Sequence, residues 1–342
     1  MRIAIGKSRC FCDNLPKFTV IWASVLLNIC LFLLGLAVLS WSADRFVYGA
    51  SALAKNIGIS PMMIGLTIVA MGSSAPEIVV SAMASINGNM NTAVGNALGS
   101  NITNVALVLG ITALVKPLLV SSTTLRREMP VLIVITLIAM SFMHDGKLAH
   151  HEGLILITLF VFILAGMAWL SLNVDKEDPL MAETAEEIPK GVSNSAALMW
   201  IGVGLILLPL SAGFMVDSAV FIARYFGISD LVIGLTIIAL GTSLPELAAS
   251  IAGVLKGEDD LALGNVIGSN IFNLLAVLGM PGLIAPGILD EDAYGRDMYV
   301  MFGLTLLLFI FCFNFKGKRQ LGRLEGGLFL AIFCLYQYWL FA

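Results

Sequence analysis

Residues 65–110 read GLTIVAMGSSAPEIVVSAMASINGNMNTAVGNALGSNITNVALVLG, and residues 234–279 read GLTIIALGTSLPELAASIAGVLKGEDDLALGNVIGSNIFNLLAVLG. The two stretches lie 169 positions apart, align without a gap and share 22 of their 46 residues. Apolar composition alone would give chance matches of Leu, Val and Ile, whereas this alignment also pairs Pro, Glu, Asn and Ser. The chain therefore contains an internal duplication, and we expect a fold built from two related halves.

Composition places both halves in a membrane. Of the 342 residues, 58% are hydrophobic and 12% are charged, whereas a soluble domain is about half apolar and about a quarter charged. This excess of apolar surface excludes a soluble enzyme, and the low charge with abundant aliphatic residues excludes a disordered chain. A formal net charge of −4 gives no indication of a nucleic-acid partner. We expect an all-α polytopic membrane protein in contact with the lipid bilayer.

Ten apolar segments are predicted to cross the hydrocarbon as helices. They lie at 18–42, 61–86, 92–115, 129–143, 153–172, 196–222, 231–255, 261–284, 298–315 and 324–342. The polar stretch 173–195 predicts a central loop between a first five-helix repeat at 1–172 and a second at 196–342. Because five is odd, the second repeat enters the membrane upside down. Inverted repeats are typical of transporters and place a site at mid-depth where the repeats meet.

Each repeat carries one acidic residue inside an otherwise apolar segment, Glu77 in the first and Glu246 in the second. A charge at the bilayer centre costs at least about 2.5–3.5 kcal/mol on insertion scales, and such residues usually line a pathway. One glutamate near a helix end could snorkel to the surface. Two at equivalent positions, each preceded by Pro, predict a functional pair.

Hydroxyl groups precede each glutamate at helical spacing. They belong to Ser73, Ser74, Thr242 and Ser243. Each lies three or four residues before Glu77 or Glu246, so hydroxyls and carboxylate share a helix face. Pro76 and Pro245 cannot donate to the carbonyl four residues earlier, so we expect broken helices with a freed carbonyl beside each carboxylate.

The next apolar segment of each repeat adds further oxygen atoms. Ser100 and Asn104 are four residues apart, as are Ser269 and Asn273, so each pair lines one helix face. With the carboxylates and carbonyls they form an all-oxygen set of donors, which suits hard cations such as Ca²⁺. The motifs contain no His or Cys, which disfavours zinc, copper and iron. We expect no cofactor, because the cation is the transported cargo.

The charge of this pocket predicts its mode of action. Two carboxylates close together in a low dielectric repel each other and cannot easily both stay ionised and empty. They need one Ca²⁺, several Na⁺ or protons. A pocket that closes readily only when neutralised does not return empty, which predicts exchange of ions across the membrane instead of leak.

Four motifs resemble the paired alpha repeats of the sodium/calcium exchangers, a family of the cation/calcium antiporter superfamily. They are GSSAPE at 72–77, GTSLPE at 241–246, GNALGSNITN at 95–104 and GNVIGSNIFN at 264–273. The resemblance covers both repeats, and the short central loop is similar to that of prokaryotic members. It implies ten helices, with the second, third, seventh and eighth around the site and the first and sixth sliding past them.

The resemblance also implies roles for individual residues. The implied Ca²⁺ ligands are Glu77, Glu246, Ser73 and Thr242. The implied Na⁺ ligands are Ser74, Ser243, Ser100, Ser269, both glutamates and the carbonyl groups of Ala70 and Ala239. Asn104 matches a central pocket position. Asn273 falls where some relatives carry Asp, which is associated with potassium-dependent members, so we expect exchange without K⁺.

Several functions compete with Na⁺/Ca²⁺ exchange. A Ca²⁺/H⁺ antiporter would use the same two glutamates as proton carriers, and the sequence leaves this alternative open. An intramembrane hydrolase would need a nucleophile–base pair or catalytic metal ligands inside a span. The repeats contain no such pair, so we expect a protein that is not an enzyme. A passive channel would show uncoupled flux. The sequence indicates no obligate protein partner.

Lysine and arginine counts predict the orientation in the cytoplasmic (inner) membrane. The loops after the first, third, fifth, seventh and ninth spans hold twelve Lys and Arg residues, whereas the opposite loops hold three. Positive charge is retained on the cytoplasmic side, so both termini are predicted to lie outside. The basic tail with Arg2, Lys7, Arg9 and Lys17 opposes this assignment.

Overall fold

The structure is a computed structural model that describes residues 17–120, 124–171, 188–257, 259–313 and 320–342. The α-helices of the first half are α1 (Lys17–Asn56), α2 (Pro61–Ile64), α3 (Ala70–Ser73), α4 (Ala75–Ile86), α5 (Met90–Thr103), α6 (Leu109–Val115), α7 (Met129–Met143) and α8 (His150–Ser171). Those of the second half are α10 (Asn194–Phe226), α11 (Asp230–Ile233), α12 (Ala239–Thr242), α13 (Leu244–Lys256), α14 (Asp259–Phe272), α15 (Gly279–Ile284), α16 (Met298–Phe313) and α17 (Arg323–Phe341).

Short π-helical turns connect or precede several of these helices. They are η2 (Gly65–Val69), η3 (Asn104–Val108), η4 (Thr124–Glu128), η5 (Gly234–Ile238), η6 (Asn273–Val277) and η7 (Ala293–Asp297). Each turn of the first half has a counterpart 169 positions later. Turns of this kind insert an extra residue into the helix and occur frequently at functional sites. The duplicated sequence therefore folds with the same local irregularities in both halves.

Seven helices of the described residues are long and apolar enough to cross a membrane, or up to nine if each of two bent helix pairs counts as one span. The predicted segment at 129–143 forms α7, which has 15 residues and is shorter than the usual spanning length of about 20 residues. The ten-span layout therefore stays a prediction. The predicted central loop lies largely outside the described residues, and α10 begins at Asn194.

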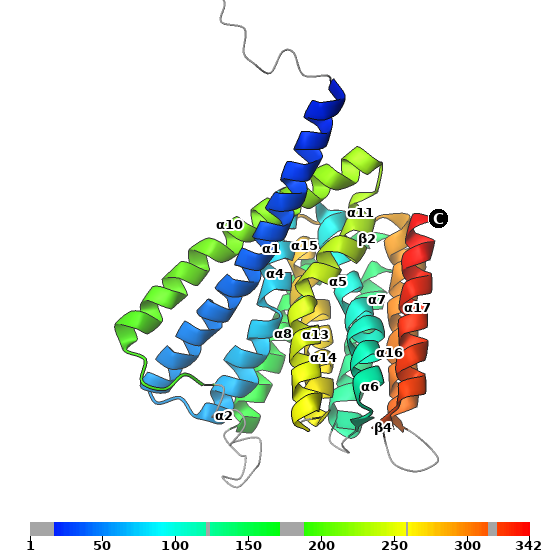
Figure 1. Cartoon of the computed structure of the whole chain (residues 1–342). Helices are drawn as coiled ribbons and strands as arrows, with labels where there is room; N and C mark the ends of the chain where they lie inside the picture. Colours follow the sequence, from blue (N-terminus) through cyan, green and yellow to red (C-terminus); the bar gives the residue numbers. More distant parts are fainter. Residues whose placement is uncertain (1–16, 121–123, 172–187, 258, 314–319) are drawn as a thin grey trace, which may run out of the picture.

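The helices of the repeated motifs form the centre of the molecule. The candidate spans Met90–Val115 and Ala262–Ile284 are each 78% buried, whereas His150–Trp169 is 11% buried and Trp22–Asn56 is 22% buried. Figure 1 shows α5 and α14 in the middle of the bundle, with α16 and α17 along one side. The predicted residues Ser100 and Ser269 are thus on the most buried helices, α5 and α14.

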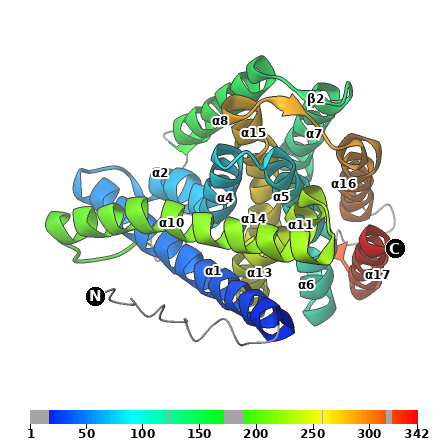
Figure 2. The same ribbon diagram turned by 90° about the horizontal axis from the view of Figure 1, so that it is seen from above.

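Two long helices, α1 and α10, pack against each other on one flank of this bundle (Figures 1 and 2). Glycine permits their close approach. A Cβ atom added at Gly49 of α1 would lie 2.7 Å from the carbonyl oxygen of Ala197 in α10. Helix α1 continues beyond the predicted apolar segment at 18–42 and ends at Asn56.

The fold differs from an all-α architecture in four two-residue strands. Strand β1 (Leu118–Leu119) pairs antiparallel with β4 (Gln320–Leu321), and β2 (Lys147–Leu148) pairs with β3 (Gly287–Ile288). Each pair joins a segment of the first half to one of the second. Pairs this short carry too weak a sequence signal to be predicted, because a strand is usually recognised by four or more alternating residues.

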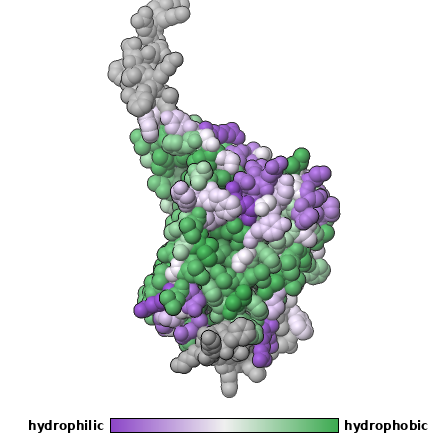
Figure 3. All heavy atoms as spheres, turned by 90° about the vertical axis from the view of Figure 1, so that its right-hand side faces the viewer, coloured by the Kyte–Doolittle hydropathy of each residue, from purple (hydrophilic) through white to green (hydrophobic). Residues whose placement is uncertain are grey.

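Apolar side chains also cover much of the outside. Figure 3 shows hydrophobic residues across the middle of one face and hydrophilic residues gathered toward its two ends. Large exposed apolar residues occur on several helices, for example Leu33 of α1, Phe162 of α8 and Leu205 of α10. A surface of this kind is stable in lipid, where every backbone polar group is satisfied inside the helices.

Candidate ion-binding site

Two broken helices place the two glutamates. Helix α3 ends and α4 begins at Ser74, and the segments Thr67–Ser73 and Ala75–Ile86 are bent by 59°. Helix α12 and helix α13 meet in the same way at Ser243, with a bend of 41° between Asp230–Thr242 and Leu244–Lys256. Proline at the start of α4 and α13 explains both breaks, because its ring cannot continue the preceding turn.

Each glutamate consequently lies in the first turn of a helix, Glu77 in α4 and Glu246 in α13. Helix N-termini carry partial positive charge from unsatisfied N–H groups, so they favour a carboxylate. The expected free carbonyl four residues before each proline, that of Gly72 or Gly241, stays a prediction. The N–H groups of Ser74 and Ser243 turn toward these oxygens, and the N–H of Ser243 donates to the carbonyl of Ala239 at 3.0 Å.

The two carboxylates lie deep inside the protein and act on each other. Glu77 and Glu246 are each 1% exposed, and the charge of Glu246 acts on the Glu77 carboxylate. The hydroxyl of Thr242 lies beside Glu77. None of the four carboxylate oxygens accepts a hydrogen bond of normal geometry from the residues that the structure describes. Burying a charge without such partners is costly, so these oxygens require a cation or a proton.

Helices α5 and α14 bring the predicted serine and asparagine residues into the same buried layer. Ser100, Asn104, Ser269 and Asn273 are all at most 2% exposed. The hydroxyls of Ser100 and Ser269, Oδ1 of Asn104 and both polar atoms of Asn273 make no hydrogen bond within the described part of the chain. Buried polar atoms are normally paired, so a group of unpaired oxygens is a signature of a missing ligand.

The remaining predicted residues are placed differently. Ser74 and Ser243 are buried with unpaired hydroxyls. The hydroxyl of Ser73, which is only half-buried, donates to the carbonyl of Ala70 at 3.2 Å. The hydroxyl of Thr242 donates to the carbonyls of Ile238 at 3.2 Å and Ala239 at 3.3 Å. These bonds leave the lone pairs of both hydroxyl oxygens available to a cation.

Three further asparagines support this layer and were not assigned a role from the sequence. Asn96 Nδ2 donates to the carbonyl of Glu77 at 3.2 Å and so fixes the start of α4. Asn104 Nδ2 donates to Oδ1 of Asn270 at 3.1 Å, and Asn270 Nδ2 reaches the carbonyl of Asn101 at 3.5 Å. The repetition of these asparagines in both motifs is a signal that could have identified them.

The serine four residues beyond each glutamate behaves differently in the two halves. Ser81 Oγ of α4 donates to the carbonyl of Val277 in η6 at 2.7 Å. Its counterpart Ser250 in α13 is buried, with no hydrogen-bond partner for Oγ among the described residues. The halves therefore share their donor atoms while they differ in how each broken helix is attached to its surroundings.

The chemistry of the assembled group is that of a hard-cation site. Its atoms are carboxylate, hydroxyl, amide and carbonyl oxygens, the donors that Ca²⁺ and Na⁺ accept. The described residues contain no group of three or more His, Cys, Asp and Glu that could hold a metal ion. Neutral oxygens would therefore have to complete a coordination shell around the two glutamates.

Comparison with known proteins gives consistent matches over both halves. The family profile described as sodium/calcium exchanger protein matches residues 27–169 and 196–342. CaxA of Alkalimonas amylolytica is 55% identical, covering 91% of this chain and 97% of CaxA. The inner membrane protein YrbG of Escherichia coli is 43% identical, covering 91% and 98%.

Two named exchangers are also similar. The sodium/calcium exchanger MaX1 of Methanosarcina acetivorans is 31% identical, covering 84% of this chain and 91% of its own length. A solved structure of the sodium-calcium exchanger NCX_Mj superposes with a TM-score of 0.61 at 34% identity, covering 91% of this chain and 97% of that one. These relatives are exchangers and membrane proteins, in agreement with a protein that is not an enzyme.

Proposed function

Because the chain belongs to the sodium/calcium exchanger family of membrane cation/calcium antiporters, we propose that it exchanges Na⁺ for Ca²⁺ through the Glu77–Glu246 site. The observation that carries this proposal is the pair of buried carboxylates without hydrogen-bond partners. One Ca²⁺ neutralises both carboxylates, and so do two Na⁺ ions. Alternating occupation by these ions gives coupled exchange, because an empty pocket keeps two repelling charges in a low dielectric.

The proposed ligands are the twelve residues predicted from the sequence. They are Glu77, Glu246, Ser73, Thr242, Ser74, Ser243, Ser100, Ser269, Asn104, Asn273, Ala70 and Ala239. The buried and unpaired oxygens among them support this set. We further propose ten spans in two inverted repeats, at 1–172 and 196–342, in the cytoplasmic membrane. The inner-membrane relative YrbG supports that location.

Na⁺ is favoured over H⁺ as the coupling ion by the neutral oxygens around the glutamates. A proton needs only a carboxylate, whereas Na⁺ uses several neutral ligands as well. The unpaired hydroxyls of Ser74, Ser100, Ser243 and Ser269 supply such ligands. A Ca²⁺/H⁺ antiporter with the same two glutamates is the alternative, and it predicts Ca²⁺ movement driven by a pH gradient without Na⁺.

The test is Ca²⁺ flux in everted membrane vesicles that contain the protein. An outwardly or inwardly directed Na⁺ gradient is expected to drive ⁴⁵Ca²⁺ movement, and Glu77→Gln or Glu246→Gln should reduce it to background, because either change removes one of the two charges. Glu152→Gln, in the first turn of α8, is the matched control and should retain flux. Wild-type flux in either site variant would contradict the assignment of the site.

A further inference from the structure

The two ends of the molecule carry different residue types at positions that are equivalent in the two repeats. Lys116 of the first half corresponds to Ala285 of the second, and Asp259 of the second corresponds to Met90 of the first, at the offset of 169. We call the end with Lys116 and β4 the latch end, and the end with Ala285 and β2 the hollow end. Figure 1 shows β4 and β2 at opposite ends of the bundle.

At the latch end, Lys116 and Asp259 join the two halves. Lys116 Nζ lies 2.9 Å from Asp259 Oδ1 and donates to the carbonyl of Val254 at 2.8 Å. Asp259 Oδ2 accepts from the backbone N–H of Leu119 at 3.3 Å. The Asp259 side chain is 9% exposed and that of Lys116 is 41% exposed. This ion pair, the latch, holds the turn between α13 and α14 against β1.

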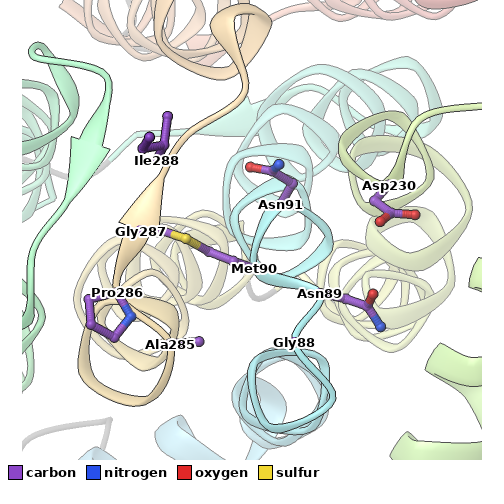
Figure 4. Close-up of a pocket in the computed structure, with 9 residues that line it drawn as sticks. All are labelled: Gly88, Asn89, Met90, Asn91, Asp230, Ala285, Pro286, Gly287 and Ile288. Carbon is purple, nitrogen blue, oxygen red and sulfur yellow. The ribbon is translucent and has the colours of Figure 1, made fainter.

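At the hollow end the corresponding segments meet without an ion pair: the backbone N–H of Asp290, just after β3, donates to Asn91 Oδ1 of α5 at 3.1 Å. A hollow of about 390 Å³ lies at this contact, with Met90, Ala285 and Gly287 among its lining residues. Figure 4 shows the Met90 side chain reaching toward Gly287, with no charged pair between these segments. The α4–α5 turn is bonded elsewhere: Asn87 Nδ2 donates to Asp217 Oδ1 of α10 at 2.9 Å.

The long flanking helices α1 and α10 also pack differently at the two ends. Helix α10 packs along α4 at the hollow end, whereas its counterpart α1 makes no comparable contact with α13 in the described part of the chain. The broken spans are bent by 59° at α4 and 41° at α13. The two ends therefore differ in two contacts among the described residues: the latch end carries the Lys116–Asp259 ion pair, and the hollow end carries the packing of a long flanking helix along the broken helix.

We propose that the Lys116–Asp259 latch sets the sidedness of exchange by stabilising the conformation in which α13 is held on β1 and stays clear of α1. The inference rests on the proposed exchange between two conformations. In the other conformation the two ends swap arrangements, α1 covers α13 and the latch is broken. An interaction present in only one of two conformations changes the ratio of their populations by an amount set by its free energy. A half-exposed ion pair shifts it about 1.4- to fivefold.

The first experiment measures apparent Ca²⁺ affinity at both faces of the membrane. Right-side-out and everted vesicles are compared, and the latch face is identified by reaction of Leu255→Cys, an exposed position of α13, with an impermeant maleimide. Lys116→Met and Asp259→Asn should weaken Ca²⁺ binding at the latch face and strengthen it at the hollow face. The ratio of half-saturating concentrations should change about 1.4- to fivefold. Lys256→Met, at the exposed end of α13, is the control and should leave the ratio unchanged.

The second experiment moves the latch to the equivalent positions. Met90→Asp with Ala285→Lys should hold the α4–α5 turn on β3, with the lysine occupying the hollow. Added to the wild type, this pair should offset the existing latch and bring the affinities at the two faces closer together. Added to the Lys116→Met, Asp259→Asn background, it should reverse the wild-type ratio.

A third measurement is independent of transport. Spin labels at Leu119 and Leu255 report the latch end, and labels at the equivalent Ile288 and Ile86 report the hollow end; all four positions are exposed. Loss of the latch should lengthen the distance between the labels at Leu119 and Leu255 and shorten the distance between those at Ile288 and Ile86. Double electron–electron resonance measures both distances. Unchanged distances together with an unchanged affinity ratio would show that the pair is only structural and would overturn the proposal. Absence of Ca²⁺ flux in the wild type would overturn the proposed function instead, and the distances would still test the latch.

Discussion

At the scale of single residues, the site is defined by oxygens that the protein leaves unpaired. The carboxylates of Glu77 and Glu246, with the hydroxyls of Ser100 and Ser269, are buried without hydrogen-bond partners among the described residues. An unpaired buried polar group costs about 1–3 kcal/mol, and more when it is charged. In the proposed function a bound cation would pair these oxygens, so we expect cation binding to raise the stability of the protein.

Asn273 provides a test of how the charge of this site sets its ion requirement. Asn273→Asp would add a third carboxylate beside two that already repel each other, and its extra charge has to be neutralised by another cation or a proton. We expect Ca²⁺ flux of the wild type to be independent of K⁺, and flux of the variant to depend on added K⁺ or on lower pH. The measurement is ⁴⁵Ca²⁺ flux at fixed Na⁺ with K⁺ and pH varied separately. A K⁺-dependent wild type would contradict the prediction.

At the scale of elements, the duplicated motifs pack differently although their sequences are similar. A Cβ atom added at Gly99 of α5 would lie 2.6 Å from the Cα of Leu235 in η5, whereas no atom of the described part of the chain lies within 4 Å of one added at Gly268 of α14. Helix α5 is therefore in tight contact with the broken span of the second half. Helix α14 faces more open space at the equivalent point.

These two glycines form a matched pair for mutation. Gly99→Ala should lower the free energy of unfolding by about 1–3 kcal/mol, because the added methyl group collides with backbone. Gly268→Ala has room for its methyl group and should be neutral, or stabilising by up to about 1 kcal/mol through helix propensity. Thermal unfolding of the purified protein in detergent measures both changes. Equal destabilisation by the two substitutions would show that the halves pack alike.

At the scale of the whole molecule, contacts between the halves form at both ends of the bundle. Strand pairs β1–β4 and β2–β3 each join one half to the other. Within the second half, Tyr336 Oη of α17 donates to Oδ1 of the fully buried Asp297 at 2.9 Å, and Arg296 Nε donates to the same oxygen at 2.7 Å. Apolar side chains cover the surface between the two ends (Figure 3). The protein is therefore organised around the membrane plane, with hydrophilic groups toward both sides of it.

Orientation is the prediction that belongs to this scale. The excess of Lys and Arg in one set of loops predicts that both termini lie outside the cytoplasm. A C-terminal fusion to alkaline phosphatase should be active, and a fusion to green fluorescent protein at the same point should be dark. Moving the fusion point to Lys256, at the end of α13, should reverse both signals. A fluorescent C-terminal fusion would show that the basic tail at residues 1–17 controls the orientation.

The repeated sequence by itself determined the duplication, the buried glutamates and the oxygen chemistry around them. These features depend on residues within a few helical turns, because proline breaks a helix locally and spacing sets a helix face. The positions of Ser100, Asn104, Ser269 and Asn273 in one buried layer follow from the same periodicity.

Only the tertiary structure decided how the two similar halves differ. The unequal bends, the Ser81 hydrogen bond without an equivalent at Ser250, and the Lys116–Asp259 latch arise from contacts between residues far apart in the chain, 143 positions in the case of the latch. A transporter needs two conformations of nearly equal free energy, so small differences in such distant contacts select which one is seen. The residues that the two repeats share carry no information about that choice, and the sequence does not show that Lys116 and Asp259 meet, because they lie 143 positions apart.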